Sequence, residues 1–145
     1  MAECPFCRIS AGLAPAYVVH EDADLLAFLD ERPLFPGHVL LIPRLHCETL
    51  LDLPDRLAPT LLIRARLLCA AMVRGLAAEG SFVAINNRVS QSVPHLHVHI
   101  VPRRRGDGLR GFFWPRGKYR DAEEAESVRQ QIEAAVRELA ADERR

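Results

Sequence analysis

The chain contains 145 residues, a length that suits a single domain able to bury its own hydrophobic core. Hydrophobic residues make up 49% and charged residues 26% of it, which excludes collagen-like and disordered chains. The 19 basic and 19 acidic side chains balance, which argues against a surface that binds nucleic acid or an anionic membrane. No apolar stretch approaches the roughly 20 residues that span a bilayer, and the N-terminus lacks a secretory signal pattern, so we expect a cytoplasmic protein.

The balanced charge hides a segregation near the C-terminus. Residues 102–120 carry seven Arg or Lys residues against one Asp and also include Phe112, Phe113 and Trp114, whereas residues 121–145 are acidic overall. The basic and aromatic segment could bind an anionic ligand that carries a flat ring, or it could pair with the acidic segment that follows it. The sequence leaves both alternatives open.

In the first half of the chain, short hydrophobic runs alternate with turn residues, which predicts strands. Two strands, Tyr17–His20 and Leu25–Leu29, are separated by acidic turn residues, and a third strand, Val39–Ile42, follows a loop rich in proline and glycine. The residues before these strands, Cys4–Gly12, predict a short helical turn that ends at the glycine.

The second half of the chain contains two helical patterns. Apolar residues spaced three and four apart predict a helix over Asp55–Glu79 that Gly80 ends. Two strands are expected after it, Phe82–Ile85 and Leu96–Val101, and a last helix begins near Asp121. A hairpin, a helix, further strands and a second helix in this order predict an α+β fold. The apolar stripe of the long helix consists of Leu57, Leu61, Ala65, Leu68, Met72 and Leu76.

Three of the six histidines occupy alternate positions, at His95, His97 and His99. Alternate side chains of a strand project from one face, so the sequence predicts that the three imidazoles lie together. A neutral imidazole with one ring nitrogen bound to a backbone carbonyl presents the other nitrogen as a nucleophile, and its neighbours can donate to an oxyanion or a leaving group. A solvent-exposed strand that happens to be rich in histidine is the alternative.

Polar side chains precede the three histidines. They are amides and a hydroxyl without a nearby carboxylate, which suits a phosphate group because phosphate oxygens accept hydrogen bonds and donate none. These residues are Asn86, Asn87, Gln91 and Ser92.

Motifs along most of the chain resemble those of the histidine triad (HIT) superfamily of nucleotide hydrolases and transferases. The matching segments are CPFC at 4–7, AFLD at 27–30, GHVLLIPRLH at 37–46, NN at 86–87 and QSVPHLHVH at 91–99. The resemblance implies one HIT domain over residues 1–145, in which residues 102–145 form an extension. It also implies an antiparallel sheet, one long central helix, a C-terminal helix, and a homodimer whose sheets join across the interface.

The resemblance assigns a role to each matching residue. His97 would attack the α-phosphorus of a nucleoside monophosphate derivative and form a nucleotidyl-histidine that water hydrolyses, while His99 would bind the phosphate and assist departure of the leaving group. The expected substrate is a purine nucleotide conjugate whose leaving group is an amine, a sulfate or a second nucleotide, and no catalytic metal is required. The nucleotide would be held by Phe28, Leu29, Asp30, His38, Asn86, Asn87, Gln91, Ser92 and His99, with Asp30 at the ribose hydroxyls.

Cys4 and Cys7 form a CxxC pair, a spacing that indicates metal binding or redox chemistry. Two thiolates suit a structural Zn²⁺ site, which needs two further ligands. The resemblance supplies them as His46 and His95. Two unrelated buried thiols are the alternative.

Two other functions remain open from the sequence. One is a nucleotide-binding regulatory module with little catalytic turnover. The other is a zinc-binding structural protein in which the histidines serve the metal alone.

Overall fold

The computed structural model describes residues 3–109 and 116–143. The chain divides into two compact units, Met1–Asp107 and Gly108–Arg145. The predicted basic and aromatic segment falls partly outside the described residues, because Arg110, Phe112, Phe113 and Trp114 are not described. Among the described residues, no helix is both long and apolar enough to cross a membrane.

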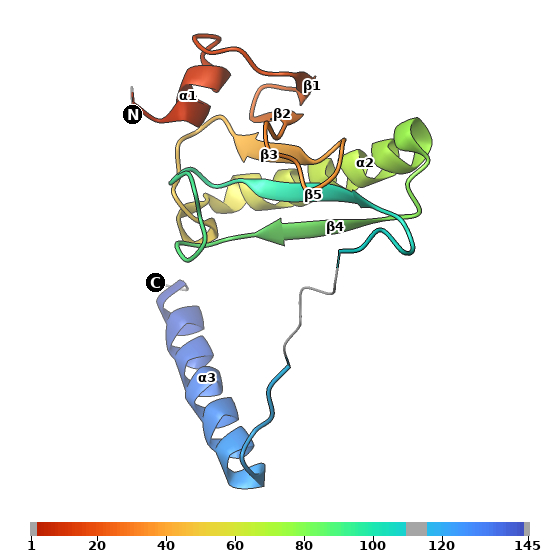
Figure 1. Ribbon diagram of the computed structural model, residues 1–145. Helices are drawn as coiled ribbons and strands as arrows, with labels where there is room; N and C mark the ends of the chain where they lie inside the picture. The colour runs from red at the N-terminus through yellow and green to blue at the C-terminus, as the bar shows by residue number, and fades with distance from the viewer. Residues whose placement is uncertain (1–2, 110–115, 144–145) are drawn as a thin grey trace. The chain divides into compact units, whose positions relative to one another are not determined.

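The first unit is built on a five-stranded sheet in which every neighbouring pair is antiparallel (Figure 1). The strands lie in the order β1-β2-β3-β5-β4. The expected α+β fold with an antiparallel sheet and one long helix is confirmed. The bounds of the strands are Val18–Glu21 for β1, Leu25–Leu29 for β2, Val39–Pro43 for β3, Gly80–Ile85 for β4 and Val98–Arg103 for β5.

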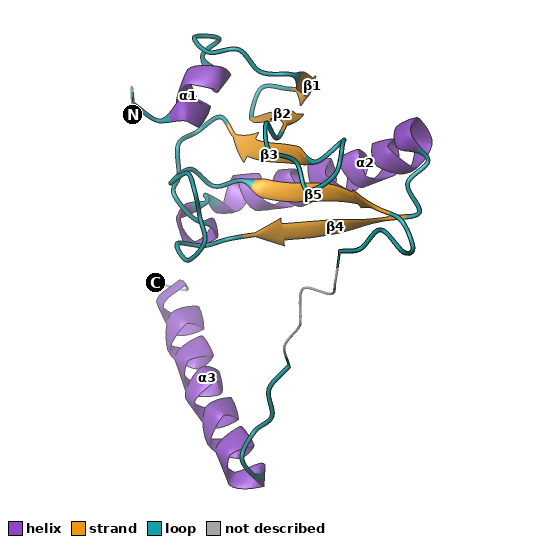
Figure 2. Cartoon of the chain, in the orientation of Figure 1, coloured by secondary structure: helices purple, strands orange, loops and turns teal. Residues whose placement is uncertain are grey.

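The two faces of the sheet have separate hydrophobic clusters, because alternate residues of a strand point to opposite faces. Leu25 and Leu41 pack with the buried stripe of helix α2 (Ala58–Leu76), which runs along one face (Figure 2). Leu26 and Leu40 pack on the other face. The cluster on that second face also contains Cys4 and Phe6, which places the short helix α1 (Pro5–Ser10) there.

Helix α2 is shorter than the spacing predicts. A 3₁₀ turn, Asp55–Leu57, precedes it, and it ends at Leu76 rather than at Glu79. The next residue, Ala77, has φ of 54° and its N–H bonds the carbonyl of Met72, so it closes the helix in the left-handed conformation. The chain must reverse here because β4 begins only three residues later.

Strand β5 begins two residues later than the histidine pattern predicts. The backbone N–H of Leu96 donates to the carbonyl of Cys47 over 2.7 Å instead of joining the ladder. The imidazole Nε2 of His95 donates to the carbonyl of Pro43 over 2.8 Å. His95 and His97 therefore lie in a segment bound to the 43–47 loop, and only His99 lies in the strand.

The second unit contains helix α3, Ala122–Glu143. Asp121 Oδ1 accepts the N–H of Glu124 over 2.8 Å, as expected for a residue that caps the helix. Arg129 pairs with Glu126 and Glu133 along its surface, and none of its described residues is buried.

Candidate functional site

A pocket of about 890 Å³ opens on the sheet face opposite α2. Six of the residues that the sequence assigns to catalysis or nucleotide binding line it: Phe28, Leu29, Asp30, Ser92, His97 and His99. The remaining lining is mostly apolar and comes from α1, from the residues before β1, from β3 and from the segment before the histidines, with Glu31 and Arg32 after β2 as its charged members. It includes Pro5, Phe6, Ile9, Pro15, Ala16, Tyr17, Leu40 and Val93.

The imidazole ring of His97 is oriented by the backbone of His95. Its Nδ1 lies 2.7 Å from the backbone carbonyl oxygen of His95, and the side chain is only 3% exposed. A carbonyl oxygen only accepts hydrogen bonds, so Nδ1 carries the proton of the neutral ring. Nε2 then carries the lone pair of this ring, which lines the pocket.

The protonation of His38 and His99 follows from one backbone donor. The N–H of Leu34 donates to His38 Nδ1 over 3.1 Å, so the proton of neutral His38 sits on Nε2. That Nε2 lies 3.0 Å from His99 Nδ1, which must therefore accept and leaves the His99 proton on Nε2. Burial lowers the pKa of His38. Burial and the neighbouring imidazoles of His97 and His38 lower the pKa of His99 to about 4, so both rings are neutral at neutral pH.

Asp30 lies beside this pair of imidazoles at the edge of the pocket. One carboxylate oxygen lies 3.6 Å from His38 Nε2, and the other accepts the backbone N–H of Arg32 over 2.9 Å. Asp30, His38 and His99 are close enough to be metal ligands. A metal at this point would need the lone pair of His38 Nε2, and Leu34 directs the proton to that atom. The group is therefore a hydrogen-bonded histidine pair beside a carboxylate, and it does not fit a cation site.

The predicted amides do not line the pocket. Asn87 Oδ1 accepts the N–H of Leu50 over 2.8 Å, and Gln91 Nε2 donates to the carbonyl of Glu48 over 2.6 Å. Both side chains thus hold the loop before the histidines against residues 48–50. Asn86 and His38 are likewise absent from the described lining, and the roles of these four residues at a nucleotide stay predictions.

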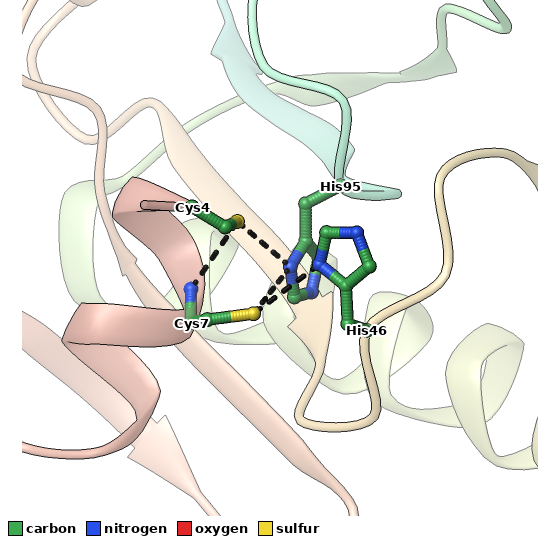
Figure 3. A group of neighbouring side chains, drawn as sticks. All are labelled: Cys4, Cys7, His46 and His95. Carbon is green, nitrogen blue, oxygen red and sulfur yellow. Dashed lines mark hydrogen bonds between the residues drawn. The ribbon is translucent and has the colours of Figure 1, made fainter. Parts of the chain in front are cut away.

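Four possible metal ligands meet where α1 approaches the histidine segment (Figure 3). His46 Nδ1 lies 3.2 Å from the sulfur of Cys7. His95 Nδ1 lies 3.4 Å from the sulfur of Cys4 and 3.6 Å from that of Cys7. The four ligand atoms all lie within 4.8 Å of one another.

The geometry and the chemistry of these four residues fit a tetrahedral zinc ion. Zn–S and Zn–N bonds of about 2.3 and 2.0 Å separate neighbouring S and N corners of a tetrahedron by about 3.5 Å, which matches the observed separations. His95 donates its Nε2–H to Pro43, so its Nδ1 lone pair faces the thiols, as a metal-binding imidazole requires. The group Cys4, Cys7, His46 and His95 therefore fits a zinc site.

The N-terminal wall of the pocket was not predicted from the sequence. Phe6 and Ile9 of α1 and Pro15 and Tyr17 before β1 face the ligand space beside the histidines. The available signal was the apolar residue inside CPFC, since a phenylalanine next to metal ligands must pack on something. Sequence alone does not say on what.

Comparison with known proteins identifies the family of this fold. The HIT domain family matches residues 11–106, which covers the sheet, α2 and the three histidines. The chain belongs to the HIT family.

A HIT-like protein of Mycobacterium tuberculosis is 42% identical over 109 residues, which cover 73% of this chain and 75% of that protein. A protein named adenylylsulfatase HINT3, from Arabidopsis thaliana, is 34% identical over 109 residues, and the match covers 74% of this chain and 55% of that longer protein. A Zn-bound histidine triad protein of Mycobacterium smegmatis has a solved structure with a TM-score of 0.71 and 36% identity. That match covers 92% of this HIT chain and 98% of the other.

Proposed function

We propose that this HIT protein is a nucleotidyl hydrolase or transferase that cleaves at the α-phosphate of a nucleoside monophosphate derivative. The observation that carries the proposal is the hydrogen bonding of two pocket imidazoles, in which His97 Nδ1 faces a backbone acceptor and His99 Nδ1 faces a ring donor. These contacts leave the lone pair of His97 on Nε2 and the proton of His99 on Nε2. A nucleophile beside a hydrogen-bond donor is the arrangement that displacement at phosphorus needs.

In the first step His97 Nε2 forms a bond to the α-phosphorus, and the bond from phosphorus to the leaving group breaks. The leaving group departs with that electron pair, as a stable anion when it is phosphate or sulfate, or after taking a proton from water when it is an amine. His99 Nε2–H stabilises the charge that develops on oxygen. In the second step water attacks phosphorus, the electron pair returns to Nε2, one water proton is released, and the nucleoside monophosphate leaves.

Asp30 and the apolar wall supply binding in this proposal. The carboxylate of Asp30 can accept hydrogen bonds from ribose hydroxyls, and Phe28 and Leu29 offer apolar surface to a base. A purine is the expected base. Adenylyl sulfate joins the phosphoramidate and the dinucleoside polyphosphate as a substrate to test, because the Arabidopsis relative is named an adenylylsulfatase.

The metal group has a supporting role in this proposal. A zinc ion held by Cys4, Cys7, His46 and His95 would act structurally, because all four ligand positions are filled by protein and none is left for a substrate. The ion would tie α1 to the segment that carries the catalytic histidines. Purified protein should contain about one zinc per chain, and Cys4→Ser should lose it.

The test follows AMP release from the three substrates by the parent and by His97→Ala. The parent should release AMP and the variant should not, while His20→Ala, which changes a histidine outside the pocket lining, should match the parent. Rapid quenching with labelled substrate should trap a phosphorus–nitrogen adduct on His97. Turnover that survives in His97→Ala would end the catalytic assignment.

A second candidate function is a nucleotide-binding regulatory module with little turnover. The observation that favours it is the engagement of Asn87 and Gln91 with backbone groups away from the pocket. AMP binding by the parent without release of AMP from any of the three substrates would identify this function.

Two further properties belong to the proposal. Strand β4 is an edge strand with Val83 44% exposed, and α2 exposes Leu62 at 72% and Val73 at 53%, which supports a homodimer that covers these residues. Sedimentation equilibrium should show a dimer, and a species that stays monomeric would contradict it.

All four cysteines are free, which supports a reducing cytoplasmic location.

A further inference from the structure

The helix that carries the two thiols also forms a wall of the pocket. Cys4 caps α1 and Cys7 lies within it, while Pro5, Phe6 and Ile9 of the same helix line the pocket. With six residues, α1 is too short to be stable by itself in water. Its position therefore depends on what holds its two cysteines and on what its apolar side chains pack against.

The ring of Phe6 lies between the metal ligands and the nucleophile. It is 7% exposed and makes edge contacts with three aromatic rings. The ring centroids are 5.9 Å apart for His95, 5.2 Å for His97 and 5.4 Å for Phe28. The Phe6 and His97 planes are nearly perpendicular, at 87°, which is a favourable arrangement for an aromatic pair.

His95 joins the two sites through its backbone as well. Its side-chain Nδ1 faces the thiols of Cys4 and Cys7, and its carbonyl oxygen accepts the Nδ1–H of His97. A change in the position of His95 therefore moves the group that orients the nucleophilic ring.

The main core of the fold lies elsewhere. The cluster between the sheet and α2 includes neither Phe6 nor any of the four ligands. Loss of a bound ion should therefore disturb the pocket before it disturbs the fold.

We infer that α1 is a metal-anchored wall of the substrate pocket, and that Phe6 is the positioning residue that couples metal binding to nucleotide affinity and to the orientation of His97. The inference rests on the proposed function and deepens it. Ligation of Cys4 and Cys7 together with His46 and His95 closes long loops of the chain and so fixes α1. Without the ion, α1 is held by its apolar contacts and by the Arg44 guanidinium, which donates to the carbonyl of Ser10 over 3.2 Å at the end of the helix. The base then loses a fixed surface to pack on.

A double-mutant cycle tests this coupling, with AMP as the probe and calorimetry as the measurement. Phe6→Leu should keep about one zinc per chain and weaken AMP binding on the order of tenfold, because an edge-to-face aromatic contact is lost. Cys7→Ser should lose the zinc and weaken AMP binding at least as much. The double variant should bind AMP no more weakly than Cys7→Ser, because both changes act through the same wall.

Two matched controls remove the same groups elsewhere. Phe82→Leu on β4 and Cys69→Ser on α2 change residues outside the pocket lining and the metal group, and they should leave the AMP affinity unchanged. Effects of Phe6→Leu and Cys7→Ser that simply add would overturn the coupling. An unchanged AMP affinity in zinc-free Cys7→Ser would overturn it too. If Cys7→Ser does not fold, the parent treated with a chelator takes its place in the cycle.

Nitrogen NMR of the imidazoles gives a readout that needs no nucleotide. In the zinc-loaded parent the His97 ring should show one tautomer with the proton on Nδ1, and chelation or Phe6→Leu should convert it into a mixture. Re-addition of zinc should restore the single tautomer in the parent and not in Phe6→Leu. If the nitrogen signals of the His97 ring do not change on chelation, the inference is overturned. A parent protein that neither binds AMP nor releases it would overturn the proposed function instead.

Discussion

His38 Nε2 lies 3.0 Å from His99 Nδ1, and this contact determines which nitrogen of His99 carries its proton. The two residues are 61 positions apart, and β3 and β5 bring them together because Leu40 pairs with His99 in the sheet. The backbone N–H of Leu34 completes the chain from the other side of His38. A fixed backbone donor thus sets the tautomers of two successive imidazoles.

Removal of the His38 ring should lower catalysis more than binding. In His38→Leu, His99 loses its Nδ1 partner and its proton is no longer directed to Nε2. We expect kcat for AMP release to fall roughly 10- to 100-fold, the usual cost of losing a group that orients a functional ligand, with a smaller change in the AMP dissociation constant. Steady-state kinetics and calorimetry check this, and His20→Leu is the matched control.

The proximity of the His97 and His99 rings, whose centroids are 4.9 Å apart, was predictable because its signal is local. Alternation within five residues indicated that three imidazoles lie together. The CxxC pair indicated metal binding or redox chemistry, and the family resemblance supplied two further metal ligands. The residue at which strand β5 begins was not predictable. The strand begins only at Val98, because Leu96 and His95 bond to the 43–47 loop, which is distant in sequence.

Other misplaced details depend on tertiary contacts. The amides of Asn87 and Gln91 are as suitable for backbone groups as for phosphate, and only the folded position of residues 48–50 decides between them. Helix α2 is closed by Ala77 in the left-handed conformation, which alanine rarely adopts, so the sequence placed the end of the helix at Gly80 instead. The N-terminal wall of the pocket likewise depends on where Phe6 packs.

The low pKa of His99 makes stability depend on pH. The ring titrates at about 4 in the folded protein and near 6.5 when unfolded, so between these values the unfolded chain binds more protons. The free energy of unfolding should therefore fall as the pH is lowered from about 6.5 to about 4. Urea unfolding at several pH values measures it. His99→Gln should show a smaller slope in this range than the parent, and an equal slope would contradict the assignment.

Gly37 should tolerate no side chain. Its φ is +99°, and a Cβ would collide with Leu76 Cδ1 and lie 3.3 Å from Pro102 Cγ. We expect Gly37→Ala to lower the free energy of unfolding by roughly 2 kcal/mol or more, because an alanine at positive φ is strained and the contact adds to it. The neighbouring His38 should also shift, with loss of activity.

Gly75 provides the matched control for Gly37. It lies in α2, and a Cβ there would meet nothing within 4 Å. Gly75→Ala should raise stability by about 0.5 to 1 kcal/mol, since alanine is the better helix former. Thermal unfolding of both variants gives the comparison. Equal effects of the two substitutions would refute the steric argument.

Asp22 organises the turn between β1 and β2. Its carboxylate accepts the backbone N–H groups of Asp24 and Leu25 over 3.0 and 2.9 Å, and Arg64 Nε of α2 over 2.7 Å. Burial opposes ionisation, but these hydrogen bonds outweigh it and hold the pKa of Asp22 below its usual range. The stability that it contributes is therefore present above about pH 4 and lost as the pH falls further.

Two substitutions separate the roles of this carboxylate. Asp22→Asn keeps an oxygen for the backbone donors and loses the charge that pairs with Arg64, so it should cost about 1 kcal/mol of unfolding free energy. Asp22→Ala loses both and should cost roughly 2 to 3 kcal/mol. Denaturant unfolding measures both. If Asp22→Asn is as destabilising as Asp22→Ala, the ion pair that joins α2 to the hairpin matters more than the turn, and Arg64→Ala should then reproduce the full loss.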